Sequence, residues 1–140
     1  MHSRSMGSGR RLALIGAIIL IVGCLLPWYT VGGDGSLPPV VFSAWAYPQG
    51  VVALLCGLGT VALVTLPYAM GPRPLAVDRG IVFGVLAAAA IAGLILWVWA
   101  VLPAPEGLLP TGAYGFWISA VGAVMMARGA FEIAQEGPRR

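Results

Sequence analysis

The sequence predicts an all-α, polytopic membrane protein, an antiparallel bundle of four transmembrane helices with both termini in the cytoplasm. Composition is the first observation. Hydrophobic residues make up 59% of the chain, charged residues only 9%, and the mean hydropathy is +0.92, far from the balance of soluble domains. The second observation is a set of four apolar runs. The length of each is close to what one membrane crossing needs, which is about 20 residues. The third is the placement of charge between these runs.

All eight basic residues are arginines, and they fall in the segments that four alternating crossings place on one side: Arg4, Arg10, Arg11, Arg73, Arg79, Arg128, Arg139 and Arg140. The other two segments, 30–47 and 102–113, carry only Asp34 and Glu106. Loops rich in arginine stay cytoplasmic. The pattern predicts a multi-pass protein of the cell inner (plasma) membrane, whose partner is the lipid bilayer. Because orientation explains the arginines, we expect no nucleic acid partner.

The first half of the chain is expected to form one hairpin. Residues 1–10 have no apolar periodicity and predict a disordered cytoplasmic tail. The first helix is expected at about 11–29, closed by Pro27 and two interfacial aromatic residues. In the outer loop, Val40-Val41-Phe42 is apolar enough to lie on the membrane surface or to pack over the helix ends. The second helix is expected at 48–68, because proline at position 48 suits a first helical turn.

The second half repeats this plan. A helix is expected at 79–102, ending before Pro103, and another at 111–134. The four helices form one transmembrane domain over residues 11–134, and residues 135–140 form a cytoplasmic tail. At an offset of 69 residues Arg10 aligns with Arg79 and Trp28 with Trp97. A duplication would produce these matches, but so would the aromatic belt of any two similar membrane hairpins.

Aromatic residues are concentrated at the predicted outer ends of the helices. All five tryptophans lie there, as expected for anchoring at the membrane interface. A functional interpretation is a docking surface or the mouth of a lipid or quinone pocket. The residues of this outer aromatic face are Trp28, Tyr29, Trp45, Tyr47, Trp97, Trp99, Tyr114 and Trp117.

Small residues recur at a spacing of four on the third and fourth helices. Such stripes let helix backbones approach closely in lipid. The pattern therefore predicts that these two helices pack tightly together along Gly80, Gly84, Ala88 and Ala92 on one, and Gly115, Ser119, Ala123 and Ala127 on the other.

Arg128 is the candidate functional residue. It follows Tyr114 by fourteen residues, which places it roughly 21 Å from the outer level at ~1.5 Å per residue. An ionisable residue at that depth is a candidate for function. The alternative is that Arg128 extends to the cytoplasmic headgroups and pairs with Glu132 one turn later.

We expect no catalytic, cofactor-binding or metal site. The only histidine is His2, and the only cysteines are Cys24 and Cys56. Their different predicted depths argue against a disulfide, so both are expected to be small packing residues.

The run Leu25-Leu26-Pro27-Trp28-Tyr29, followed by a short loop with Trp45, resembles small uncharacterised four-helix membrane proteins of high-GC bacteria. The resemblance covers the whole topology and implies no activity. Claudin-like tetraspans share the topology, but this chain lacks their paired outer-loop cysteines. Small multidrug transporters need a glutamate within helix one, where this chain has no ionisable residue between Arg11 and Asp34.

These observations favour a non-enzymatic integral membrane protein, an accessory, assembly or scaffolding component that acts through helix packing and its outer aromatic face. Its partner would be another membrane protein or a second copy. The alternative is a small channel or transporter for a neutral or anionic substrate, with Arg128 lining the pathway.

Overall fold

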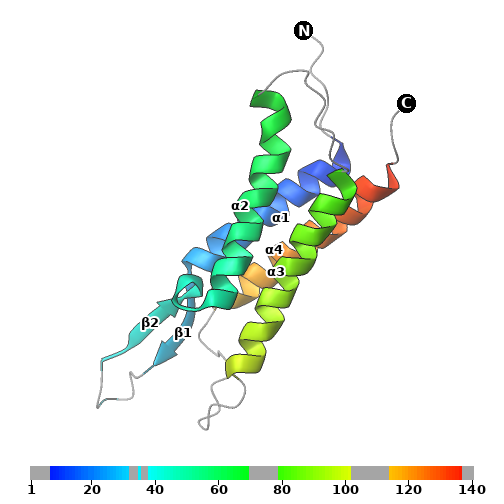
Figure 1. Ribbon diagram of the computed structural model, residues 1–140. Coiled ribbons are helices and arrows are strands. Elements are labelled where there is room, and N and C mark those ends of the chain that lie inside the picture. The colour runs from blue at the N-terminus through cyan, green and yellow to red at the C-terminus, as the bar shows by residue number, and fades with distance from the viewer. Residues whose placement is uncertain (1–6, 32–34, 36–37, 70–78, 102–113, 137–140) are drawn as a thin grey trace.

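The computed structural model describes residues 7–31, 35, 38–69, 79–101 and 114–136, and helices dominate this part of the chain (Figure 1). The helices are α1 (Ser8–Leu25), α2 (Pro48–Ala69), α3 (Arg79–Val101) and α4 (Tyr114–Gln135). At ~1.5 Å per residue, helices of 18 to 23 residues are about as long as a hydrocarbon core is thick. All four are long and apolar enough to cross a membrane, which confirms the helical prediction.

The first helix differs from its predicted bounds at both ends. It begins at Ser8 rather than near Arg11, so the prediction of disorder is wrong for residues 8–10, while residues 1–6 lie outside the described part. It ends at Leu25 rather than Tyr29, because Leu26 is extended (φ −82°, ψ 162°). A residue before proline disfavours the helical region. The other helices keep their predicted positions, although residues 102 and 111–113 lie outside the description.

A β-hairpin follows α1 and was not predicted. Strands β1 (Pro27–Val31) and β2 (Val40–Ser43) pair antiparallel, with Tyr29 opposite Phe42, and the register shifts between Pro27 and Tyr29. A 3₁₀ turn, η1 (Ala44–Ala46), joins β2 to α2. The hairpin projects beyond the helix ends (Figure 1). Its β-branched and aromatic residues on either side of a glycine-rich segment are typical of such a motif.

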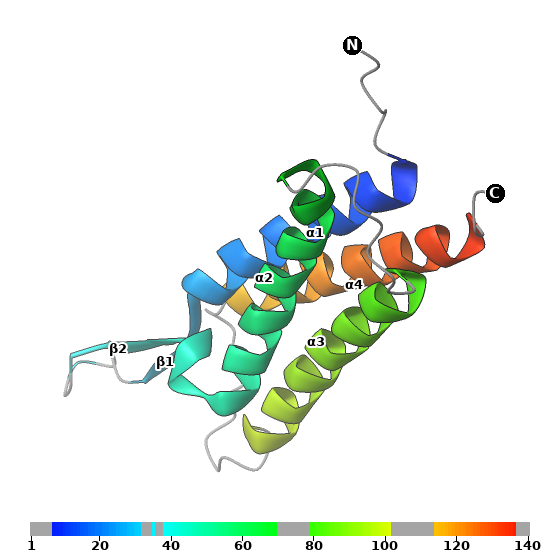
Figure 2. The same ribbon diagram turned by 45° about the horizontal axis from the view of Figure 1, so that its top comes forward.

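Helices α1 and α4, the first and last of the four described helices, lie side by side and antiparallel (Figure 2). Their contact is built on glycines at intervals of seven residues, which fall on one helix face because seven residues make close to two turns. We call this contact the glycine seam. Its members are Gly9, Gly16 and Gly23 on α1, and Gly115, Gly122 and Gly129 on α4.

The two backbones of the glycine seam touch. A Cβ atom on Gly16 would lie 2.6 Å from the Met126 backbone nitrogen, and one on Gly129 would lie 2.5 Å from the Ala13 nitrogen. A Cβ on Gly122 would meet the Leu20 nitrogen. Lipid offers no hydrophobic drive for helix association. Close packing of two backbones, as in the glycine seam, is therefore a main source of the attraction between helices in a membrane.

The remaining helices complete a ring in which each contacts the next. Helix α2 meets α1 at Gly57, where a Cβ would lie 3.0 Å from Ile21 Cγ1, and it meets α3 near Gly93. One buried cluster fills the centre and the end of the bundle that carries the hairpin. A smaller one, formed by Val64, Phe83 and Ala130, fills the other end.

Candidate functional site

The predicted outer aromatic residues gather at one end of the bundle, where α1 and α3 end and α2 and α4 begin (Figure 1). We call it the aromatic end, and the opposite end, with Arg10, Arg11 and Arg128, the arginine end. Exposure divides the eight residues. Four are largely exposed, at 56 to 73% of their surface: Trp45, Trp99, Tyr114 and Trp117. Tyr29 and Tyr47 are partly buried, whereas Trp28 and Trp97 are buried.

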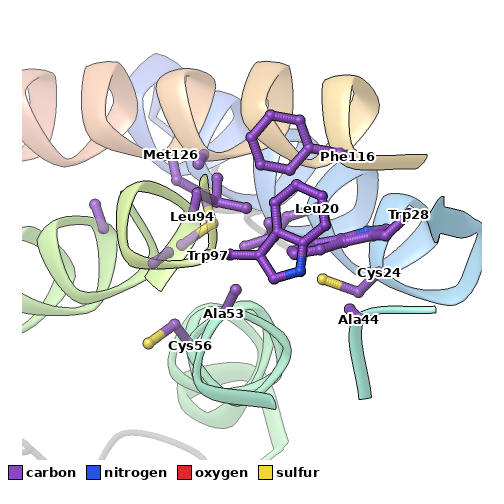
Figure 3. Close-up of a cluster of buried hydrophobic side chains, with 14 residues drawn as sticks. Leu20, Cys24, Trp28, Ala44, Ala53, Cys56, Leu94, Trp97, Phe116 and Met126 are labelled. Carbon is purple, nitrogen blue, oxygen red and sulfur yellow. The ribbon is translucent and has the colours of Figure 1, made fainter. Parts of the chain in front are cut away.

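The outer-face assignment is therefore wrong for Trp28 and Trp97, which belong to the core (Figure 3). Their rings meet edge to face with centroids 5.2 Å apart, and Phe116 stacks on Trp97 at 4.9 Å. Tyr47 adds a fourth ring, 6.2 Å from Trp97. These are the geometries that aromatic quadrupoles favour. These four rings connect the hairpin, α3, α4 and the residue that links η1 to α2.

The two buried indoles differ in hydrogen bonding. Trp28 Nε1 donates to the Gly23 carbonyl at 2.9 Å, in the last turn of α1, where the Leu26 N–H also donates to this carbonyl at 3.3 Å. Trp97 Nε1 has no hydrogen-bond partner among the described residues, and neither does Gln49 Oε1.

The small-residue stripes have different surroundings from those predicted. On α4, Gly115, Ser119 and Ala123 are buried and Ala127 is partly buried, but the glycine seam joins this helix most closely to α1 rather than α3. The seam also holds Ser119, whose hydroxyl donates to the Gly115 carbonyl at 2.9 Å and lies 3.8 Å from Cys24 Sγ.

On α3 the predicted stripe does not form the close contact. A Cβ on Gly84 would meet nothing within 4 Å, Ala88 and Ala92 are exposed, and Gly80 is partly exposed. The inward face of α3 is instead made of Phe83, Ala87, Ala90, Leu94 and Trp97, which are buried.

Arg128 lies on the outside of the bundle, with 71% of its side chain exposed, and its Nε is 3.5 Å from Glu132 Oε1. The predicted pairing with Glu132 is confirmed. Because the guanidinium faces away from the other helices, a pathway lined by Arg128 does not run through the interior of one chain.

Both cysteines are free and buried, with 1% of Cys24 and 7% of Cys56 exposed. Figure 3 shows their sulfurs apart, on either side of Ala53. In the described ranges, no group of three His, Cys, Asp or Glu residues is placed to hold a metal ion.

We predict that neither thiol of the folded protein reacts with a water-soluble maleimide in mild detergent, because both are packed between helices. Mass spectrometry should find no adduct before denaturation and two adducts after it in SDS. The control is Ala46→Cys, at an exposed residue of the aromatic end, which should gain one adduct in the folded protein. Native labelling of Cys24 would contradict the glycine seam.

The fold and these sites define a class, that of helical proteins with four helices able to cross a membrane. Comparisons with known protein families, curated proteins and solved structures found no match.

Proposed function

We propose that this chain is an integral membrane accessory or scaffolding protein that presents its aromatic end to a partner protein in the same membrane. The observation that carries the proposal is the hairpin beyond the helix ends. It holds Val40 and Val41 with 50% and 54% of their surface exposed, next to Trp45 at 63%. Exposed apolar groups beyond a bundle end are typical of an interaction site.

The elements beneath this surface are closely packed. The hairpin leaves α1 directly, and Trp28 at its base packs against Trp97 and Phe116. The glycine seam holds α1 against α4, and α4 carries the exposed Tyr114 and Trp117. A surface held on packed elements keeps its shape, which lowers the entropic cost of binding.

The arginine distribution supports an inner-membrane location with the arginine end in the cytoplasm. In that orientation the hairpin stands on the outer side. The partner would contact the hairpin and the four exposed aromatic residues. Trp28 and Trp97 are buried in the core and are not available for this contact.

Site-specific photocrosslinking in intact cells tests this function. A photoreactive amino acid at Val41 or Trp45 should give one discrete protein adduct, because these side chains are exposed on the presented surface. The matched control is Ile18, which is 49% exposed on the middle of α1 and should yield lipid adducts only. Adducts of equal intensity at all three positions, or protein adducts at Ile18 alone, would refute the proposal.

A further inference from the structure

The arginine end brings arginines of two helices to the same depth. A Cβ on Gly129 would touch both the Gly9 carbonyl and the Ala13 nitrogen, so this turn of α4 lies level with residues 10–12 of α1. Arg128 precedes Gly129 directly, and Arg10 and Arg11 lie within the facing turn. Arg11 is exposed and Arg10 is partly exposed. The glycine seam thus fixes the relative height of these arginines.

The guanidinium of Arg128 has more N–H donors than its ion pair with Glu132 uses. Its Nε faces Glu132 Oε1 at 3.5 Å, and the described residues offer the guanidinium no other ion-pair partner. Glu132 packs along the seam, where its Cβ lies 3.0 Å from a Cβ built on Gly9. A guanidinium has five N–H donors in a planar fork that matches phosphate oxygens. One carboxylate contact through Nε leaves the outward edge of the fork available.

The surroundings of Arg128 on its own helix face are apolar. Val124 and Phe131, at the helical spacings i−4 and i+3, are 64% and 61% exposed, so they flank the arginine on the same face. The stripe continues toward the aromatic end through Val121 and Trp117. A charged donor bordered by exposed hydrocarbon matches a molecule that has a phosphate and acyl chains, and it does not match a free inorganic anion.

We propose that Arg128 binds the phosphate of a phospholipid in the leaflet at the arginine end, whose acyl chains lie along the exposed face of α4, with Arg11 adding positive charge at the same depth on α1. Charge complementarity favours an anionic phospholipid, since four arginines of the described residues belong to this end (Arg10, Arg11, Arg79 and Arg128), against two glutamates, Glu132 and Glu136. This inference requires only that the helices span a membrane. It is independent of the docking role of the aromatic end.

Native mass spectrometry of the full chain in detergent, titrated with phosphatidylglycerol, tests the site. Arg128→Gln should weaken binding of the first lipid about fivefold, because one arginine near a membrane surface contributes about 1 kcal/mol. Arg128→Lys should retain part of the affinity, since it keeps the charge and loses the fork. Glu132→Gln should tighten binding, because it removes the competing carboxylate. A structural role alone would make both Arg128→Gln and Glu132→Gln weaken it.

The control is Arg139→Gln, which removes the same charge from the segment beyond α4 and should leave the first lipid unaffected. Three outcomes would overturn the proposal: equal losses for Arg128→Gln and Arg139→Gln, displacement of the lipid by excess inorganic phosphate, or equal affinity for phosphatidylcholine and phosphatidylglycerol. Helical content by circular dichroism checks that each variant is folded. If Arg128→Gln is not folded, the changes in lipid affinity of Arg128→Lys and Glu132→Gln test the proposal instead.

Discussion

Gly16→Ala is expected to destabilise the bundle by about 1–3 kcal/mol, the usual cost of overpacking a tight contact. The added methyl group would lie 2.6 Å from the Met126 nitrogen and 2.8 Å from the Gly122 oxygen. Both are backbone atoms, so no side chain can move aside and α1 and α4 must separate. Reversible unfolding in mixed micelles, with SDS as denaturant and circular dichroism as the signal, measures the change.

Gly84→Ala is the matched control, because it adds the same methyl group where nothing lies within 4 Å. It should be neutral or stabilise the protein by about 0.5–1 kcal/mol, since alanine restricts the unfolded chain more than glycine does. If Gly84→Ala proved the more damaging of the two, the tight contact would be the predicted one along α3 rather than the glycine seam.

Trp28→Ala is expected to cost about 3 kcal/mol, as large-to-small substitutions in a packed core do. The indole is fully buried against Trp97 and Phe116, and its N–H bonds the Gly23 carbonyl. Trp99→Ala, at a side chain 73% exposed, should change the free energy of unfolding by about 0.5 kcal/mol or less. The same micelle assay compares them.

The pair Trp28→Phe and Trp97→Phe separates ring packing from hydrogen bonding. Trp28→Phe removes a hydrogen bond worth about 0.5–1.5 kcal/mol, whereas Trp97→Phe removes a buried donor that has no partner among the described residues. Trp97→Phe should therefore be the milder change. The opposite order would mean that the Trp28 N–H contributes little at the end of α1.

The helices could be predicted from the sequence because apolar length and proline placement act locally. Pro27 and Pro48 restrict their own backbones whatever surrounds them. The pairing of Arg128 with Glu132 could be predicted for the same reason, since a spacing of four places two side chains together on any helix.

The burial of Trp28 and Trp97 in the core, and the identity of the helix that packs against α4, could not be predicted in this way. The aromatic-belt rule gives a height along the membrane and does not say whether a ring faces lipid or other helices. For α4, small residues at a spacing of four predict a contact with α3, whereas the actual contact, with α1, uses glycines at a spacing of seven, Gly115 with Gly122 and Gly9 with Gly16. Among the four helices, three successive glycines at this spacing occur only in α1 and α4, so the longer run marks these two helices as partners.

The glycine seam also constrains the order of assembly. Helix α1 precedes α2, α3 and α4 along the chain, so it is synthesised before its tightest neighbour and has no α4 to pack against until α4 has been made. During that interval the groove formed by Gly9, Gly16 and Gly23 is open to other helices. A chain that stops before α4 would keep this groove permanently, and membrane proteases or insertion chaperones that recognise unpaired helix faces could then distinguish it from a finished bundle.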